Sequence, residues 1–201
     1  MSARIRWGEQ AGAGAAARLV SWLRSLIEAR PPTLRDSLPP LPAVLRRGVT
    51  ATQYLAAEQS RDHAAAAVAA AAAADDALAA RAWWQADAWG HRALWHFERA
   101  EMTLDATRAA RRIGEIRVAA GDPRSARRYY AEAISEARDI GAEHEEGLAA
   151  MGLGRAELEL GNATTGRRLA QIALDLFERA GAPAGDVAAA RELRGEEKEV
   201  G

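Results

Sequence analysis

Histidine is the side chain that most often serves as a metal ligand or a general base, so the histidines are the first candidates for chemistry. The chain has four, His63, His91, His96 and His144. His91 and His96 are five residues apart, which places them on different faces of a helix, and neither an HExxH nor an ExxH spacing occurs. The pattern predicts structural or solvent-exposed histidines and no metal site.

Carboxylates could act as general acids or bases, and Glu143, Glu145 and Glu146 form one dense group. They fall at an expected helix start, where the helix dipole favours negative charge, so no catalytic role is needed to explain them. Gly12-Ala13-Gly14 lacks the strand and the glycine pattern of a phosphate-binding loop. No serine or threonine nucleophile motif occurs, and the absence of cysteine removes disulfides and thiolate ligands. The sequence therefore predicts a non-enzymatic protein without a cofactor.

A group of tryptophans, Trp83, Trp84, Trp89 and Trp95, is the remaining candidate for a binding site. Large indole rings would compensate for an alanine-rich interior, so most of the group is expected in the core. Adjacent helical residues point about 100° apart, so Trp83 and Trp84 should not share one environment. The alternative is that one of them lies at an interface, where tryptophan often dominates binding.

Composition limits the partners that these residues could serve. The 201 residues carry a net charge of −1, with residues 1–60 at +4 and residues 61–201 at −5. An acidic second region without a helix of clustered basic residues argues against nucleic-acid binding. No segment approaches the roughly 18 apolar residues of a membrane span, and no signal-peptide pattern is visible. We expect a cytoplasmic protein, and the arginine and alanine bias is typical of a GC-rich bacterial genome.

The elements that would position these residues follow from four glycines spaced twenty residues apart. Each closes a stretch with a helical pattern, and glycine can take the left-handed conformation that caps a helix end. The four are Gly121, Gly141, Gly161 and Gly181. Two intervals make a 40-residue unit, which indicates stacked helical hairpins. We expect helix pairs at residues 75–87 with 90–103, 106–120 with 122–140, and 143–160 with 163–180, then a last helix at 184–194.

The first sixty residues follow a different pattern. An amphipathic helix is expected at residues 18–30, where Leu19, Trp22, Leu23, Leu26 and Ile27 form one apolar stripe. A proline-rich connector follows, then a short helix at 44–59, and Asp62 is expected to cap the alanine-rich helix after it. The expected domains are residues 1–60, a repeat region at 61–195 and a charged tail at 196–201. The amphipathic helix either caps the repeats or docks on a partner or membrane surface.

The repeat pattern resembles the tetratricopeptide repeat (TPR) family over residues 75–194. The resemblance lies in small residues where paired helices cross and in a bulky residue beside them. On the second helix these residues are Ala93, Phe97 and Ala100 in the first unit, Ala126, Tyr130 and Ala133 in the second, and Gly166, Ala170 and Ala173 in the third. Gly114 and Gly154 take the small position of the first helix, where the first unit has Arg81. The unit offsets are 33 and then 40 residues.

The resemblance implies an all-α array of helical hairpins with a right-handed superhelix, in which the first helix of each hairpin lines a concave groove. Carried over by position, the groove residues of the second unit are Arg108, Arg111, Arg112, Glu115 and Ala119, and those of the third are Leu148, Met151, Arg155, Leu158 and Glu159. The first unit would add Leu78, Ala82 and Gln85. Arg111 and Arg155 are expected to be exposed on one side without a buried carboxylate partner. The alternative is an ordinary solvated face with ion pairs along the helix.

These features predict a scaffold that binds a protein or peptide, and an acidic-hydrophobic segment would suit the arginines and apolar residues of the groove. The asparagines with which chaperone-binding TPR domains hold a peptide C-terminus are missing. Two other functions stay open: a regulatory sensor of a peptide or small ligand, and a structural subunit or assembly factor of a larger complex. The sequence assigns no oligomeric state.

Overall fold

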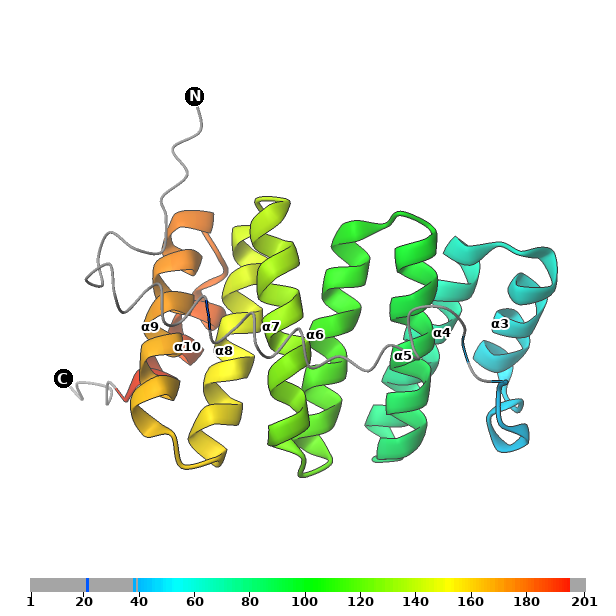
Figure 1. Cartoon of the computed structure of the whole chain (residues 1–201), viewed down its shortest axis with the longest axis horizontal. Helices are drawn as coiled ribbons and strands as arrows, with labels where there is room; N and C mark the ends of the chain where they lie inside the picture. The colour runs from blue at the N-terminus through cyan, green and yellow to red at the C-terminus, as the bar shows by residue number, and fades with distance from the viewer. Residues whose placement is uncertain (1–20, 22–37, 39, 196–201) are drawn as a thin grey trace.

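The computed structural model describes residues 21, 38 and 40–195 of the chain. Within these residues all regular structure is helical, and Figure 1 shows the helices side by side in one row, with α3 at one end and α9 and α10 at the other. A short 3-10 helix, η1 (Ala43–Leu45), precedes them. The α-helices are α3 (Val49–Ser60), α4 (His63–Ala79), α5 (Trp83–Arg99), α6 (Thr103–Ala119), α7 (Pro123–Asp139), α8 (Glu143–Glu159), α9 (Ala163–Ala180) and α10 (Ala184–Arg194).

The twenty-residue spacing governs a longer stretch than the glycines indicate. Helices α4 to α9 begin at twenty-residue intervals, and the turns between them repeat one left-handed backbone position. Glycine fills that position from Gly121 onward, whereas upstream of it the series runs through Arg61, Arg81 and Glu101, with φ of 56° or 57°. Non-glycine residues adopt this conformation only at an energetic cost. Because no glycine stands at these three helix ends, the sequence pattern does not mark them.

The expected first helix pair, 75–87 with 90–103, is wrong. Arg81 lies in the turn after α4, and Gly90 lies in the middle of α5 instead of at a helix start. The alanine-rich segment and the start of the expected repeats therefore form one continuous helix. The first unit is offset from the second by 40 residues, not 33, which puts Ala74 at the small position assigned to Arg81. The second-helix series becomes Ala86, Gly90 and Ala93 in place of Ala93, Phe97 and Ala100.

The expected helices at 106–120, 122–140, 143–160, 163–180 and 184–194 are confirmed, with ends shifted by a few residues. The expected helix at 44–59 is divided into η1 and α3. Asp62 and Asp122 cap α4 and α7, accepting from the backbone N–H of Ala65 at 2.9 Å and of Ser125 at 3.1 Å. Asn162 occupies the corresponding position before α9 but does not cap the helix with its side chain. Its amide instead donates to Glu157 at 2.6 Å.

Hairpins form from α4 with α5, α6 with α7, and α8 with α9, and each packs on the next. The predicted crossings are crowded: Ala126 and Ala133 are fully buried. Tyr130 fills the space between two glycines of neighbouring hairpins, because a Cβ on Gly114 or Gly152 would lie 2.8 or 2.4 Å from its ring. Small residues thus permit close helix approach and one large ring seals the contact.

At the ends of the array, α3 packs on α4 and α10 packs on α9 and α8. The expected helix at 18–30, apart from Ser21, and the tail at 196–201 lie outside the described residues. None of the described helices has the length and apolar character needed to cross a bilayer.

Candidate interaction surface

The arginines predicted from the second unit meet carboxylates of both neighbouring first helices. The Nε atoms of Arg108 and Arg111 lie 2.8 and 3.2 Å from the two carboxylate oxygens of Glu145 on α8. The Glu145 side chain is only 10% exposed, so the expectation that Arg111 would lack a buried carboxylate partner is wrong. The carboxylate of Glu145 thus accepts from two guanidinium groups of α6, and these ion pairs connect α8 to α6.

On the other side of α6, Arg112 joins α4. Its Nε donates to Asp75 at 2.8 Å, and its Nη1 lies 2.7 Å from Glu115 on the same helix. Glu115 also pairs with Arg111. The three arginines expected to line the groove are therefore balanced by acidic residues within the protein, and they do not present three uncompensated positive charges.

The residues predicted on α8 divide between surface and interior. Arg155 and Glu159 are exposed, and no ion pair to Arg155 occurs within the described part of the chain. Leu148 is half-buried, whereas Met151 is 8% exposed and belongs to the core. Leu158 packs against Gly166 inside the hairpin, where a Cβ on that glycine would lie 2.6 Å from it. Sequence reasoning thus placed too many of these side chains on the surface.

Tyr130 shows which predicted residues share a side. Burial raises the pKa of this phenol, Glu115 and Glu159 raise it further, and Arg111 and Arg155 oppose the effect. Four predicted residues from α6 and α8 therefore lie near enough to this buried phenol to act on its pKa. We call the surface bearing Asp75, Arg108, Arg111, Arg112, Glu115, Leu148, Arg155 and Glu159 the first-helix surface.

Ala82 and Gln85, which the sequence analysis assigned to the first helix of the first unit, do not lie on a first helix. Ala82 precedes α5 and Gln85 lies on α5, which is the second helix of its hairpin. Leu78 lies on α4 and packs with Ala77, Ala86 and Ile116. Helix α4 instead contributes residues one turn or more earlier. The error in the first helix pair is the cause.

A cavity of about 450 Å³ opens between α4 and α6, with α5 as its floor. Its wall and floor consist of small or apolar residues, Ala71, Ala74, Gly90, Ala93, Phe97 and Ala109. Its rim holds three acidic and three basic residues, Asp75, Asp105, Glu115, Arg108, Arg111 and Arg112. Four of the predicted site residues therefore line one cavity. The sequence analysis did not identify the apolar part of this cavity. With the correct 40-residue offset for the first unit, the alanine run and Gly90 would have indicated it.

A buried polar network joins α3 to the first hairpin. The Tyr54 hydroxyl donates to Glu58 at 3.0 Å and lies 3.2 Å from Nε2 of His96, whose Nδ1 lies 2.9 Å from Nδ1 of His63. Because Tyr54 donates its proton to Glu58, Nε2 of His96 must donate to the phenol, and His63 must donate to Nδ1 of His96. Burial, aided by the charges of His63 and Arg92, lowers the pKa of His96 to about 4.

The other two histidines contact polar partners at hairpin contacts. Nε2 of His91 lies 3.1 Å from the Tyr129 hydroxyl, and Nε2 of His144 lies 2.8 Å from Asp186 on α10. Each histidine thus links helices that are distant in the sequence. This matches the structural role predicted for them.

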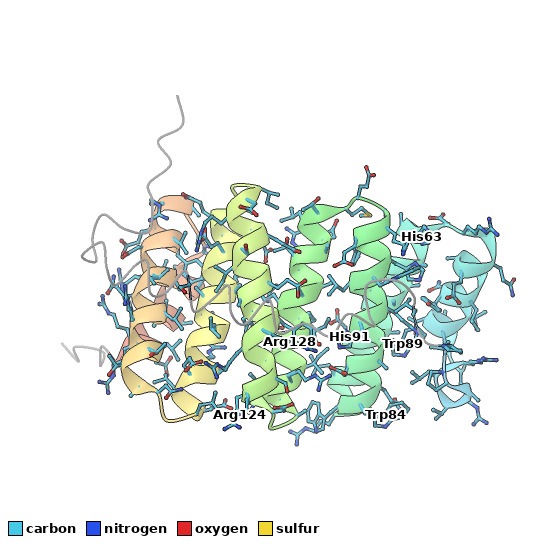
Figure 2. All side chains as sticks on the ribbon, viewed as in Figure 1. His63, Trp84, Trp89, His91, Arg124 and Arg128 are labelled. Carbon is cyan, nitrogen blue, oxygen red and sulfur yellow. The ribbon has the colours of Figure 1, made fainter. Side chains whose placement is uncertain are left out.

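The tryptophans occupy different environments, as the helical geometry predicts. Trp89 is 4% exposed and packs edge-on against Tyr54, with ring centroids 5.1 Å apart. Trp84 is 54% exposed, and Figure 2 shows it on the same long edge of the row of helices as Arg124. Trp83 and Trp95 are partly buried. Of the four, only Trp89 belongs to the core, so the expectation that most of the group would lie there is wrong.

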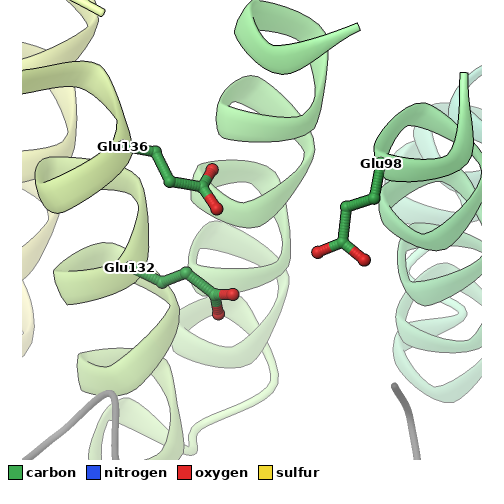
Figure 3. A group of neighbouring side chains, drawn as sticks. All are labelled: Glu98, Glu132 and Glu136. Carbon is green, nitrogen blue, oxygen red and sulfur yellow. The ribbon is translucent and has the colours of Figure 1, made fainter. Parts of the chain in front are cut away.

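Three carboxylates converge between α5 and α7, a group that the sequence analysis did not identify. Figure 3 shows Glu98 reaching toward Glu132 and Glu136, and single oxygens of the three lie within 4.8 Å of one another. The group could hold a cation by its donor set. Each carboxylate already interacts within the protein, and Glu136 accepts from Thr107 at 3.2 Å. The spacing of Glu132 and Glu136, four apart on one helix, was the available signal.

Comparisons with known proteins assign no family to this chain. No protein-family model matches it, and no curated protein is found as a relative. Function must therefore be argued from the surface itself.

Proposed function

We propose that the chain is a non-catalytic, TPR-like scaffold that binds a segment of a partner protein along the first-helix surface. The observation that carries this proposal is the cavity between α4 and α6, with its apolar floor and charged rim. A concave apolar site with a few polar groups around it is the usual form of a binding site. The surface continues onto α8, where Leu148 offers apolar area and Arg155 an exposed cation.

The balance of charge modifies the partner that we propose. Arg108, Arg111 and Arg112 already have carboxylate partners, so a purely acidic segment would have to displace them. Arg155 is the better contact for a partner carboxylate. An acidic-hydrophobic segment therefore fits best with its acidic part over α8 and its apolar part over the cavity.

A sensor for a small ligand is the second candidate, since a volume of about 450 Å³ falls within the range of small-molecule sites, roughly 300–1,000 Å³. The charged rim and the extension of the surface over α8 favour a longer, partly charged occupant. We therefore place the protein-binding function first.

The test uses peptides selected from a random displayed library on the full chain, with affinities measured by fluorescence anisotropy. Arg155→Glu should weaken the selected peptides about fivefold or more by opposing their carboxylates. Arg124→Glu, the same charge change at an exposed position of α7, is the matched control and should leave affinity unchanged. Failure to select any peptide, or equal effects of both variants, would contradict the proposed surface.

A further inference from the structure

The cavity between α4 and α6 occupies the place that a tyrosine ring fills one repeat later. With the 40-residue offset, Tyr130 corresponds to Gly90, and the glycines on either side of its ring, Gly114 and Gly152, correspond to Ala74 and Arg112. Gly90, Ala74 and Arg112 all line the cavity. The first unit thus keeps the helix framework of the second but lacks the ring that seals the contact.

The environment of Tyr130 is a guide to this space, although Ala74 and Arg112 carry the Cβ atoms that Gly114 and Gly152 lack, so an occupant lies farther from these two helices than the Tyr130 ring does. That ring is only 3% exposed and lies against the backbone of two first helices. In the first unit the space is bounded by methyl groups and by Phe97, so its floor offers a ring contact but no polar side chain. A flat aromatic group matches such a slot and gains from packing on another ring.

We propose that this cavity, on the first-helix surface of the proposed function, receives an apolar aromatic side chain of the partner segment. Phenylalanine suits it best, because the hydroxyl of a tyrosine entering from the surface would point toward Ala93 and Phe97, which offer no side-chain hydrogen-bond partner. The most exposed rim charges are Asp75 and Arg108, whose side chains are 59% and 49% exposed. Both already form ion pairs, Arg108 with Glu145 and Asp75 with Arg112, so a basic residue on one side of the phenylalanine and an acidic residue on the other would share these pairs from the solvent side.

Two variants fill the cavity with groups that other repeats already carry. Gly90→Tyr places a ring at the position of Tyr130, but its Cβ would lie 3.0 Å from Cγ1 of Ile113. Its ring would also meet Ala74 and Arg112 where the second unit has glycines, so these neighbours must shift and Ala71→Met is the primary variant. Ala71→Met introduces the side chain that Met151 provides at the equivalent position of the third unit. Ala72→Met makes the same change at the adjacent, exposed residue and is the matched control.

The probe is the set of library peptides selected on the full chain. We expect a phenylalanine at one fixed position, and its replacement by alanine should weaken binding roughly tenfold or more, as for an anchor residue. Ala71→Met and Gly90→Tyr should weaken binding as strongly, while Ala72→Met should not; circular dichroism verifies that each variant is folded. Phenylalanine should bind more tightly than tyrosine at the anchor position.

Other occupants give different results. Peptides that respond to Arg155→Glu but not to Ala71→Met, and that lack an aromatic residue, would overturn the anchor while leaving the proposed function intact. Equally tight binding of free N-acetylphenylalanine amide would assign the cavity to a small ligand and overturn the partner segment. Self-association of the chain that Ala71→Met abolishes would assign it to a second copy and overturn the proposal as well.

Discussion

At the scale of single residues, the junction between α3 and the first hairpin depends on one neutral imidazole. His96 is 2% exposed, and it accepts from His63 while donating to Tyr54. A second proton on Nδ1 of His96 would be accommodated only if His63 moved its own proton to Nε2 and accepted at Nδ1, and it would place a charge where the His96 side chain is buried. Tyr54, itself fully buried, keeps its hydrogen bond from Nε2 of His96 in either state, so the cost of the second proton is the burial of its charge.

This junction predicts a loss of stability in acid. The folded pKa of His96, about 4, lies below the ordinary value of 6.5, so the unfolded chain binds the proton more readily between these two values. The free energy of unfolding should therefore fall as pH decreases from about 6.5 to about 4, by roughly 3 kcal/mol from this residue. Urea unfolding across that range measures it.

His96→Gln is the comparison for that series. It removes the titrating group while keeping a polar side chain, so the difference in stability between the two chains should shrink as pH falls. A difference that stays constant from pH 7 to pH 4 would show that His96 is not protonated on unfolding.

At the scale of elements, helix ends decided how well the sequence predicted the fold. Gly121, Gly141 and Gly161 marked their turns because glycine is the residue that suits a left-handed position. Arg81 takes the same conformation with a φ of 56°, but arginine carries no such preference and its turn was misplaced. The wrong turn shifted one helix pair, so Ala82 and Gln85 were assigned to a surface formed by other residues.

The same turn provides a test of helix-end energetics. Arg81→Gly should stabilise the chain by about 0.5–1 kcal/mol, because relief of the left-handed strain exceeds the added freedom of the unfolded chain. Ala80→Gly, one residue earlier with a φ of −76°, should instead destabilise it. Thermal melting of both variants compares them directly, and a lower midpoint for Arg81→Gly would contradict the assigned strain.

At the scale of the whole molecule, the all-helical array and its 40-residue unit were predictable, whereas the site was predictable only in part. Arg108, Arg111, Arg112 and Glu115 line the cavity as part of the expected surface. Their carboxylate partners could not be inferred, because Glu145 and Asp75 lie 34 or more residues away and meet them only through hairpin packing. The TPR-like superhelix remains a proposal.

The alanine content of α4 has a consequence for the order in which the array opens. All seven buried side chains of α4 are alanines, whereas α6 buries Ile113 and α9 buries Leu169 and Phe177. Alanine removes little apolar surface from water, so burial stabilises α4 by less free energy than the helices after it.

Native-state hydrogen exchange should show amides of α3 and α4 exchanging together, before those of α6 to α9. Equal protection of α4 and α8 would contradict this order. The wall of the cavity would then be the part of the molecule that opens first, so an occupant should slow exchange most in α4.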